Sequence, residues 1–136
     1  MKFPETHIKK GQYKLHSGEM SGVFYDVNAM LGNYEGFSKI IKFIEYPKSG
    51  NQFGTYVGIA TGGAIIASQF RDFAMVKDGE LKGHITGSWC LIDDVVTTER
   101  SIKEAINLIY TEPTEIFVVV DRRKEKTLDI TSMYEV

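Results

Sequence analysis

The sequence predicts an α/β fold built on a doubly wound parallel sheet. Apolar runs bounded by turn residues alternate with segments whose apolar residues recur at helical spacing. One run, Ile116 to Val120, is entirely apolar and mostly β-branched, as expected of an interior parallel strand. The chain has 136 residues, of which 43% are hydrophobic, which suits one domain with a modest core. We therefore expect residues 1–136 to form a single domain with short crossovers.

The first thirty residues are expected to form a small separate segment ahead of the sheet. Residues 1–11 are polar and predict an irregular or partly helical lead. Residues 11–30 alternate loosely and are broken by Ser17-Gly18 and Ser21-Gly22, which favours a hairpin-like pair of strands. Residues 23–27 are the expected second strand.

The middle of the chain predicts a helix, a strand, a glycine turn and a second helix. Phe37, Ile40, Ile41 and Ile44 lie at i, i+3, i+4 and i+7, so residues 34–46 predict a helix that Pro47 closes. The expected elements that follow are a turn at 48–51, a strand at 55–60, a glycine turn at 61–63, a helix at 64–70 and a strand at 73–76.

The last part of the chain repeats this alternation. Residues 77–87 are polar and contain three glycines, and we interpret them as a loop. The expected elements after it are a central strand at 89–93, a helix at 101–110, the apolar strand at 116–120 and an edge strand at 130–134.

The segment from Trp89 to Ser101 contains the most informative motif. Its apolar strand ends in Asp93 and Asp94, and a hydroxyl-rich turn then leads into a helix. Parallel strands place such carboxylates at the edge of a sheet where α/β proteins bind ligands, and a turn before a helix binds phosphate through its N–H groups. An isolated acid pair is common, and Thr-Thr is ordinary helix capping. The whole pattern is more specific, and it resembles the signature of type I phosphoribosyltransferases, which bind phosphoribosyl pyrophosphate (PRPP).

Two further motifs extend the resemblance. Gly58 to Ala64 forms a strand and a glycine turn about 30 residues ahead of the acid pair, and glycines let backbone approach a bulky anion. This order resembles the pyrophosphate and PRPP loops of phosphoribosyltransferases. Gly11 to Asp26 resembles the hood that covers orotate in orotate phosphoribosyltransferases, and Val120-Asp121-Arg122 resembles their strand ending in Asp-Arg.

The resemblance implies a type I phosphoribosyltransferase sheet with a small N-terminal hood at residues 1–30. It also implies transfer from PRPP to orotate, giving orotidine 5′-monophosphate for pyrimidine nucleotide synthesis. Mg²⁺ would be bound through PRPP and water rather than directly, and a homodimer would complete the active site. By position, the catalytic residues would be Asp93, Asp94, Lys82 and His84. The PRPP-binding residues would be Ala60, Thr61, Gly62, Gly63, Lys77, Val96, Thr97, Thr98, Glu99, Arg100 and Ser101. The base-binding residues would be His16, Phe24, Tyr25, Thr97 and Arg122.

The sequence departs from the family pattern at three places. Glu99-Arg100 replaces glycine in the phosphate turn, where a carboxylate repels phosphate unless it points away or Arg100 compensates. His16 and Glu19 stand where many members have basic residues. The catalytic loop is short: either Lys82-Gly83-His84 supplies its Lys-x-His spacing, or residues 81–87 only connect to the central strand.

Bulk properties exclude some classes and leave alternatives open. The net charge is −2, so nothing favours nucleic acid as a partner, and no apolar run has membrane length. Cys90 is the only cysteine and lies in an expected buried strand, which favours a reducing cytoplasm. An active orotate phosphoribosyltransferase is the first hypothesis. The alternatives are a PRPP- or nucleotide-binding protein with little turnover and a phosphoribosyltransferase for another base.

Overall fold

A six-stranded, mostly parallel sheet forms the centre of the molecule. The computed structural model describes residues 2–14, 20–46 and 52–136. The strand order is β5-β4-β3-β6-β7-β8, and only the pairing of β5 with β4 is antiparallel. The strands are β3 (Thr55–Ile59), β4 (Phe73–Lys77), β5 (Glu80–Lys82), β6 (Trp89–Val96), β7 (Glu115–Asp121) and β8 (Thr131–Glu135). The predicted doubly wound α/β sheet is therefore confirmed.

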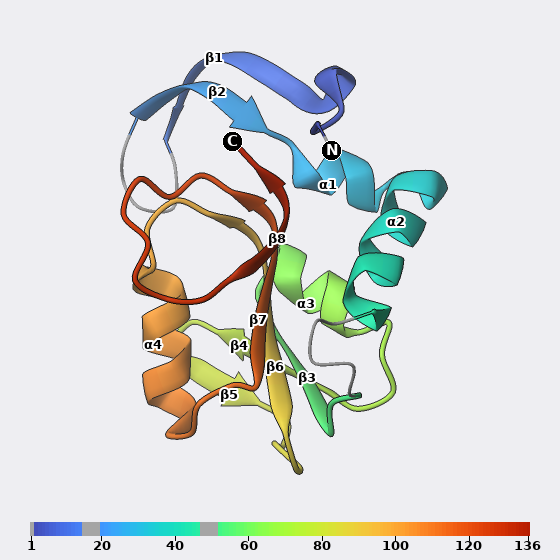
Figure 1. Ribbon diagram of the computed structural model, residues 1–136, viewed down its shortest axis with the longest axis vertical. Helices are drawn as coiled ribbons and strands as arrows, with labels where there is room; N and C mark the ends of the chain where they lie inside the picture. Colours follow the sequence, from blue (N-terminus) through green and yellow to red (C-terminus); the bar gives the residue numbers. More distant parts are fainter. Residues whose placement is uncertain (1, 15–19, 47–51) are drawn as a thin grey trace.

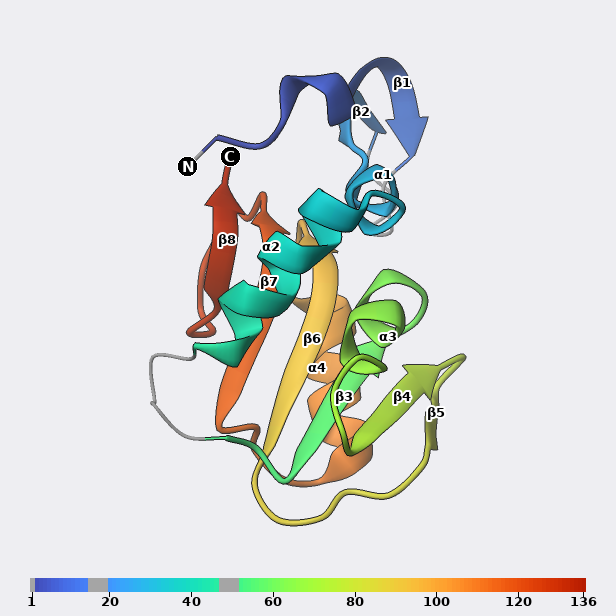
Figure 2. The same ribbon diagram turned by 90° about the vertical axis from the view of Figure 1, so that its right-hand side faces the viewer.

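Helices cover both faces of this sheet (Figures 1 and 2). α1 (Val27–Leu31), α2 (Tyr34–Glu45) and α3 (Gly62–Ala67) lie on one face, and α4 (Arg100–Ile109) lies on the other. Along β6, Ile92 packs in the core that contains α2 and α3, whereas Leu91 packs in the core that contains α4. Because both faces are buried, β6 and β7 are apolar on both sides, as their sequences indicate.

A hairpin lies over the carboxyl ends of the central strands (Figure 1). It consists of β1 (Ile8–Lys14) and β2 (Met20–Tyr25), and a 3-10 turn, η1 (Glu5–His7), precedes it. Phe3 anchors this hood, because its ring meets those of Tyr25 and Tyr134 edge-on at centroid distances of 5.3 Å. The hairpin-like pair of strands is confirmed.

The hood differs from the expectation at both of its ends. The lead is not irregular up to residue 11, since β1 already begins at Ile8. The second strand ends at Tyr25, and Val27 opens α1 instead of closing the strand. The cause is the capping residue Asp26, whose carboxylate accepts a hydrogen bond from the Ala29 N–H at 3.1 Å.

The segment at 77–87, expected from its sequence to be a loop, is not one throughout, because Lys77 ends β4 and residues 80–82 form β5. Asp78 and Gly79 have φ values of 51° and 73°, and they join β4 to β5 as a two-residue hairpin turn. An Asp-Gly pair is the residue combination that such turns favour. β5 consequently runs from the carboxyl end of β4 back toward its amino end.

The central strand and the glycine-turn helix also have different bounds from those expected. β6 continues beyond Asp93 to Val96, because it stays paired with β7 until Val96 lies opposite Asp121. The acid pair thus lies within the strand, not at its end. α3 begins at Gly62, two residues before the expected start. No helix in ranges 2–14, 20–46 and 52–136 is both long and apolar enough to cross a membrane.

Candidate active site

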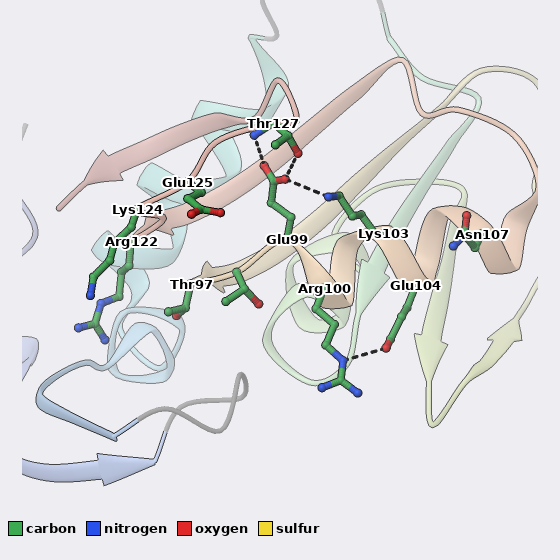
Figure 3. A pocket seen from close by; sticks show the side chains of 11 residues that line it. Thr97, Glu99, Arg100, Lys103, Glu104, Asn107, Arg122, Lys124, Glu125 and Thr127 are labelled. Atoms are coloured by element: carbon green, nitrogen blue, oxygen red, sulfur yellow. Dashed lines mark hydrogen bonds and ion pairs between the residues drawn. The ribbon is translucent and has the colours of Figure 1, made fainter.

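Four hollows lie around the carboxyl ends of β3, β6 and β7. One, of about 680 Å³, is lined by Thr97, Thr98, Glu99, Arg100 and Arg122 among others and is shown in Figure 3. The other three are named here. The first, of about 180 Å³, lies under the hood and is called here the base pocket. The second, of about 30 Å³, lies at the turn before α4 and is called the phosphate hollow. The third, of about 710 Å³, lies between the end of β3, the β4–β5 turn and α4, and is called the outer pocket. Most of the predicted site residues line one of these three hollows.

The acid pair lies between these hollows, and its two members differ in environment. Asp93 is buried, with 7% of its surface exposed, whereas Asp94 is half-buried and lines the base pocket. The Asp94 N–H donates to Asp93 Oδ1 at 2.8 Å. Burial, and then the charge of Asp94, raise the pKa of Asp93 well above its usual range. Asp93 therefore keeps a proton more readily than an ordinary aspartate, and Asp94 is the member of the pair that lines the base pocket.

The glycine turn packs directly against this acid pair. A Cβ atom on Gly63 would lie 2.2 Å from the Ile92 carbonyl oxygen, and one on Gly62 would lie 2.6 Å from Asp94 Oδ2. These glycines therefore allow α3 to approach β6, which is a different reason from the predicted approach to an anion. Ala60 and Thr61, joined by a cis peptide bond, line the outer pocket together with Lys77.

The phosphate hollow is formed by the turn that leads into α4. Its lining residues are Asp93, Val95, Val96, Thr97, Thr98, Arg100, Ser101 and Ile102. The Lys103 N–H donates to the Glu99 carbonyl at 2.9 Å and closes the first turn of α4. The N–H groups before Lys103 have no partner within the helix, and they give this end positive potential. Hydroxyl groups and helix N–H groups together suit a phosphate.

Glu99 does not line the phosphate hollow, although it lines the adjacent hollow of Figure 3 with Thr98 and Arg100, and its charge is paired within the protein. It is the N-cap residue of α4, yet its carboxylate makes no capping bond. Figure 3 shows it directed toward Thr127 and Lys103. It accepts from Arg123 Nη1 at 2.6 Å, from the Leu128 N–H at 2.8 Å, and from the hydroxyl and N–H of Thr127. Arg100 lines the phosphate hollow, and its Nε makes an exposed pair with Glu104 at 3.2 Å.

The pKa of Glu99 follows from these contacts. Burial acts to raise it, but hydrogen bonds from Thr127, Leu128 and Arg123 outweigh burial and lower the pKa to about 2. Glu99 is consequently charged at neutral pH, and its charge is paired inside the protein.

The base pocket brings together the predicted aromatic residues and arginine. It is lined by Lys14, Phe24, Tyr25, Val27, Asn28, Asp94, Val95, Thr97 and Arg122. Arg122 Nη2 donates to Ser21 Oγ at 2.9 Å, Nη1 donates to the Val23 carbonyl at 3.2 Å, and the guanidinium lies 4.9 Å from the centre of the Tyr25 ring. Arg122 is therefore fixed by the hood it faces.

Some pocket residues were missed, and one predicted residue is not described. Lys14 lies in the hood motif but was not singled out, although its position on β1 places a cation in the base pocket. Asn28 was missed because α1 was not expected. His16 lies outside the described residues.

Lys82 and His84 are not brought to the acid pair within one chain. Lys82 ends β5 opposite Met75, in the middle of β4, and its ammonium pairs with Glu80 at 3.4 Å. Gly83 lies beside Ala74, and His84 follows it toward the amino end of the sheet and is exposed. This path matches the alternative in which residues 81–87 connect to the central strand. Lys77, at the carboxyl end of β4, is the cation that lines the outer pocket.

Comparisons with known proteins agree with this arrangement. No protein-family model matches the sequence. The chain is 33% identical over 129 residues to the orotate phosphoribosyltransferase of Pyrobaculum aerophilum, covering 83% of this chain and 66% of that protein. It is 32% identical over 133 residues to that of Sulfurisphaera tokodaii, covering 84% and 67%. The crystal structure of the Aeropyrum pernix orotate phosphoribosyltransferase aligns with a TM-score of 0.73 at 24% identity, covering 85% of this chain and 76% of that one.

The chain has the fold of the type I phosphoribosyltransferases. The chain spans about two thirds of the length of the curated relatives it matches. With identities above 30% over that length, it belongs to the orotate phosphoribosyltransferase family, a family of transferases.

Proposed function

We propose that this chain transfers the phosphoribosyl group of PRPP to orotate, giving orotidine 5′-monophosphate and pyrophosphate in pyrimidine nucleotide synthesis. The observation that carries the proposal is the meeting of three subsites at one sheet edge. The phosphate hollow and the base pocket are contiguous, since Thr97 lines both. The acid pair joins them, since Asp93 lines the phosphate hollow and Asp94 lines the base pocket. A sugar with a phosphate at one end and a planar anion at the other fits this order.

Each subsite has a role that follows from its groups. The turn at Thr97 to Ser101 would hold the 5′-phosphate through N–H and hydroxyl donors. Asp94, half-buried beside it, would accept hydrogen bonds from the ribose hydroxyls. Arg122 would face the orotate carboxylate, and Phe24 and Tyr25 would frame its ring. The substrate is thus positioned with its anomeric carbon near the acid pair.

The reaction itself needs little covalent help from the protein. A ring nitrogen of orotate forms a bond to the anomeric carbon while the bond from that carbon to pyrophosphate breaks. Pyrophosphate leaves with the electron pair, and the proton of the ring nitrogen is released to pyrophosphate or to solvent. Positive charge builds on the sugar and negative charge on the leaving group. Asp94 lies on the side where positive charge develops, and Lys77 in the outer pocket is the chain's cation for pyrophosphate.

The family implies Mg²⁺, and the acid pair suits it. A Cβ atom at Gly62 would collide with the Asp94 carboxylate. Because glycine has none, a carboxylate oxygen that can act as a metal ligand faces the glycine turn. Mg²⁺ prefers oxygen ligands and is usually held by one or two carboxylates, substrate phosphates and water. We propose that Asp94, with Asp93 behind it, is where PRPP-bound Mg²⁺ would be held, directly or through water. When bound, the ion would neutralise charge on pyrophosphate.

Family membership also supports a homodimer and a place in the cytoplasm, and we include both in the proposal. The single cysteine, Cys90, is buried in β6 as a free thiol, as a reducing compartment permits.

Arg122→Ala tests the assignment of the base pocket. The KM for orotate is expected to rise about 10- to 100-fold, because a lost hydrogen bond to a charged group costs about 1.5–3 kcal/mol. The KM for PRPP should change much less. Steady-state kinetics with each substrate varied in turn measures both. Lys42→Ala is the matched control, since Lys42 is exposed on α2 and lines none of the hollows at this edge of the sheet. An equal effect of the two substitutions on orotate would show that Arg122 has no specific role.

Lys82→Ala and His84→Ala test the short catalytic loop. We expect each to lower kcat by less than about 3-fold, because β5 leads both residues away from the acid pair. Lys77→Ala should lower kcat by about 10²-fold or more, the cost of removing a transition-state donor. A similarly large loss from Lys82→Ala or His84→Ala would contradict this and would mean that these residues serve the site of a second chain.

A further inference from the structure

A buried ionic cluster includes Glu99, which belongs to the turn that forms the phosphate hollow. It consists of Glu99, Asp121 and Arg123, and the Thr127 hydroxyl and N–H complete it. The side chains of Asp121 and Arg123 are each 3% exposed, and that of Glu99 is 6% exposed. Charged groups are seldom buried to this degree without a partner for each hydrogen-bonding atom. The cluster is therefore part of the interior and not a solvated face.

Arg123 is bonded on every side of its guanidinium. Its Nε and Nη2 donate to the two oxygens of Asp121 at 3.0 and 2.8 Å, which is a forked, two-point pair. Its Nη1 donates to Glu99 Oε2 at 2.6 Å and to the Leu128 carbonyl at 2.8 Å. Such a planar set of contacts fixes the orientation of Arg123, which lysine does not reproduce.

Each end of the cluster is one peptide bond away from a substrate subsite. Glu99 is flanked by Thr98 and Arg100, which both line the phosphate hollow. Arg123 directly follows Arg122, which lines the base pocket, and the Arg122 N–H donates to the Val96 carbonyl at 2.8 Å. The cluster thus connects the turn before α4 to the end of β7. None of its members lines the phosphate hollow or the base pocket, but Glu99 and Thr127 line the hollow of Figure 3, which Thr97 and Arg122 also line.

A gain in stability alone does not explain this arrangement. Buried ion pairs are often no more stabilising than well-packed apolar residues, because desolvation offsets the attraction between the charges. A forked pair, unlike apolar packing, holds its two partners in a single fixed geometry. The cluster contains two carboxylates and only one guanidinium, so one negative charge remains to be balanced. Two lysines at its edge balance this charge: Lys103 lies 3.5 Å from Glu99, and Lys126 lies 3.9 Å from Asp121.

We propose that Glu99 and Arg123 are positioning residues that hold the phosphate turn and Arg122 in one fixed relation, so that the 5′-phosphate and base subsites are set together. The proposal rests on the function proposed above. Glu99 stands where the family pattern has glycine in the phosphate turn. Its charge is compensated by Arg123, which lies 24 residues further along the chain. Neither residue touches substrate in this account.

Glu99→Gln and Arg123→Met test the proposal. Each is expected to raise two quantities by about 10-fold, the Kd for ribose 5-phosphate and the KM for orotate, which corresponds to about 1.4 kcal/mol at each subsite. Calorimetric titration gives the first and steady-state kinetics the second, both well below the melting temperature of each variant. Glu135→Gln is the matched control, since it removes an exposed carboxylate that pairs with Lys126 at the rim, and we expect it to change neither quantity.

A purely structural role would give a different result. Lower melting temperatures with an unchanged Kd and an unchanged KM in both variants would overturn the proposal. So would tighter binding of ribose 5-phosphate by Glu99→Gln, since that is the outcome of simple repulsion. If Glu99→Gln does not fold, Thr127→Val removes one donor to Glu99 and should shift both quantities in the same direction by a smaller factor.

The pH dependence gives a further readout. Because the pKa of Glu99 is about 2, the ratio of wild-type to Glu99→Gln activity should be constant from pH 5 to 9. A ratio that changes over this range would mean that Glu99 exchanges protons in the reaction and is not a positioning residue. A wild-type chain that binds ribose 5-phosphate but does not consume orotate would contradict the proposed function alone, and the ribose 5-phosphate titration would still decide the role of the cluster.

Discussion

Replacing Asp93 and Asp94 together by asparagine is expected to lower kcat/KM for PRPP by about 10²- to 10³-fold, the usual cost of removing a group that stabilises transition-state charge. Asparagine has about the same size as aspartate. Its side-chain oxygen at residue 93 still accepts the hydrogen bond that the N–H of residue 94 donates. It removes the negative charge that, under the proposed function, would face the sugar and its metal ion. Steady-state kinetics with PRPP as the varied substrate measures the effect.

The same substitution should leave the fold intact. The pKa of Asp93 is raised by its burial and by the charge of Asp94, so a neutral residue suits that position. The melting temperature of the double variant should equal or exceed that of the wild type. Asp72→Asn is the control, because it removes an exposed carboxylate at the start of β4, away from the acid pair. A double variant with wild-type kcat/KM would disprove the assignment of the acid pair.

Glu99→Gln is expected to lower the free energy of unfolding by roughly 3 kcal/mol at pH 7. This is the stabilising free energy that corresponds to a pKa lowered from 4.5 to about 2 on folding. A carboxyl whose folded pKa is depressed contributes stability that is present above its unfolded pKa. This contribution is lost as the pH falls through the folded value. The difference between wild type and variant should therefore be full above about pH 5 and should shrink between about pH 4.5 and 2.

Urea denaturation at a series of pH values checks this expectation. Glu35→Gln is the control, since the Glu35 side chain is 81% exposed and its pairing with Lys39 is a surface contact. A surface change of this kind should stay within about 0.5 kcal/mol at every pH. If the difference caused by Glu99→Gln is the same at pH 3 and pH 7, the charge of Glu99 is not the source of its stabilising effect.

Elements with strong periodicity were predictable from the sequence, and those set by pairing were not. The helices expected at 34–46 and 101–110 are α2 (Tyr34–Glu45) and α4 (Arg100–Ile109), and the apolar strand is β7. β5 was missed because its residues are polar, although Asp78-Gly79 is a hairpin turn pair. The length of β6 depends on its register with β7, and no local pattern in Asp93 to Val96 indicates it.

The site was predictable where family motifs mark its residues, and unpredictable where no motif marks a contact. Phe24, Tyr25, Thr97 and Arg122 line one pocket as expected. Thr97 and Arg122 follow the neighbouring strands β6 and β7, and the hairpin that ends in Tyr25 lies over the carboxyl ends of these strands (Figure 1). The direction of Glu99 depends on Arg123 and Thr127, which lie 24 and 28 residues further along the chain. Short-range propensities contain no information on such contacts.

The most direct test of the proposed function is a single reaction containing the chain, PRPP, orotate and Mg²⁺, with products separated by chromatography. The account predicts that orotidine 5′-monophosphate and pyrophosphate appear in equal amounts and that orotate is consumed at the same rate, only when Mg²⁺ is present. Binding of PRPP without consumption of orotate, or consumption of adenine in place of orotate, would contradict it.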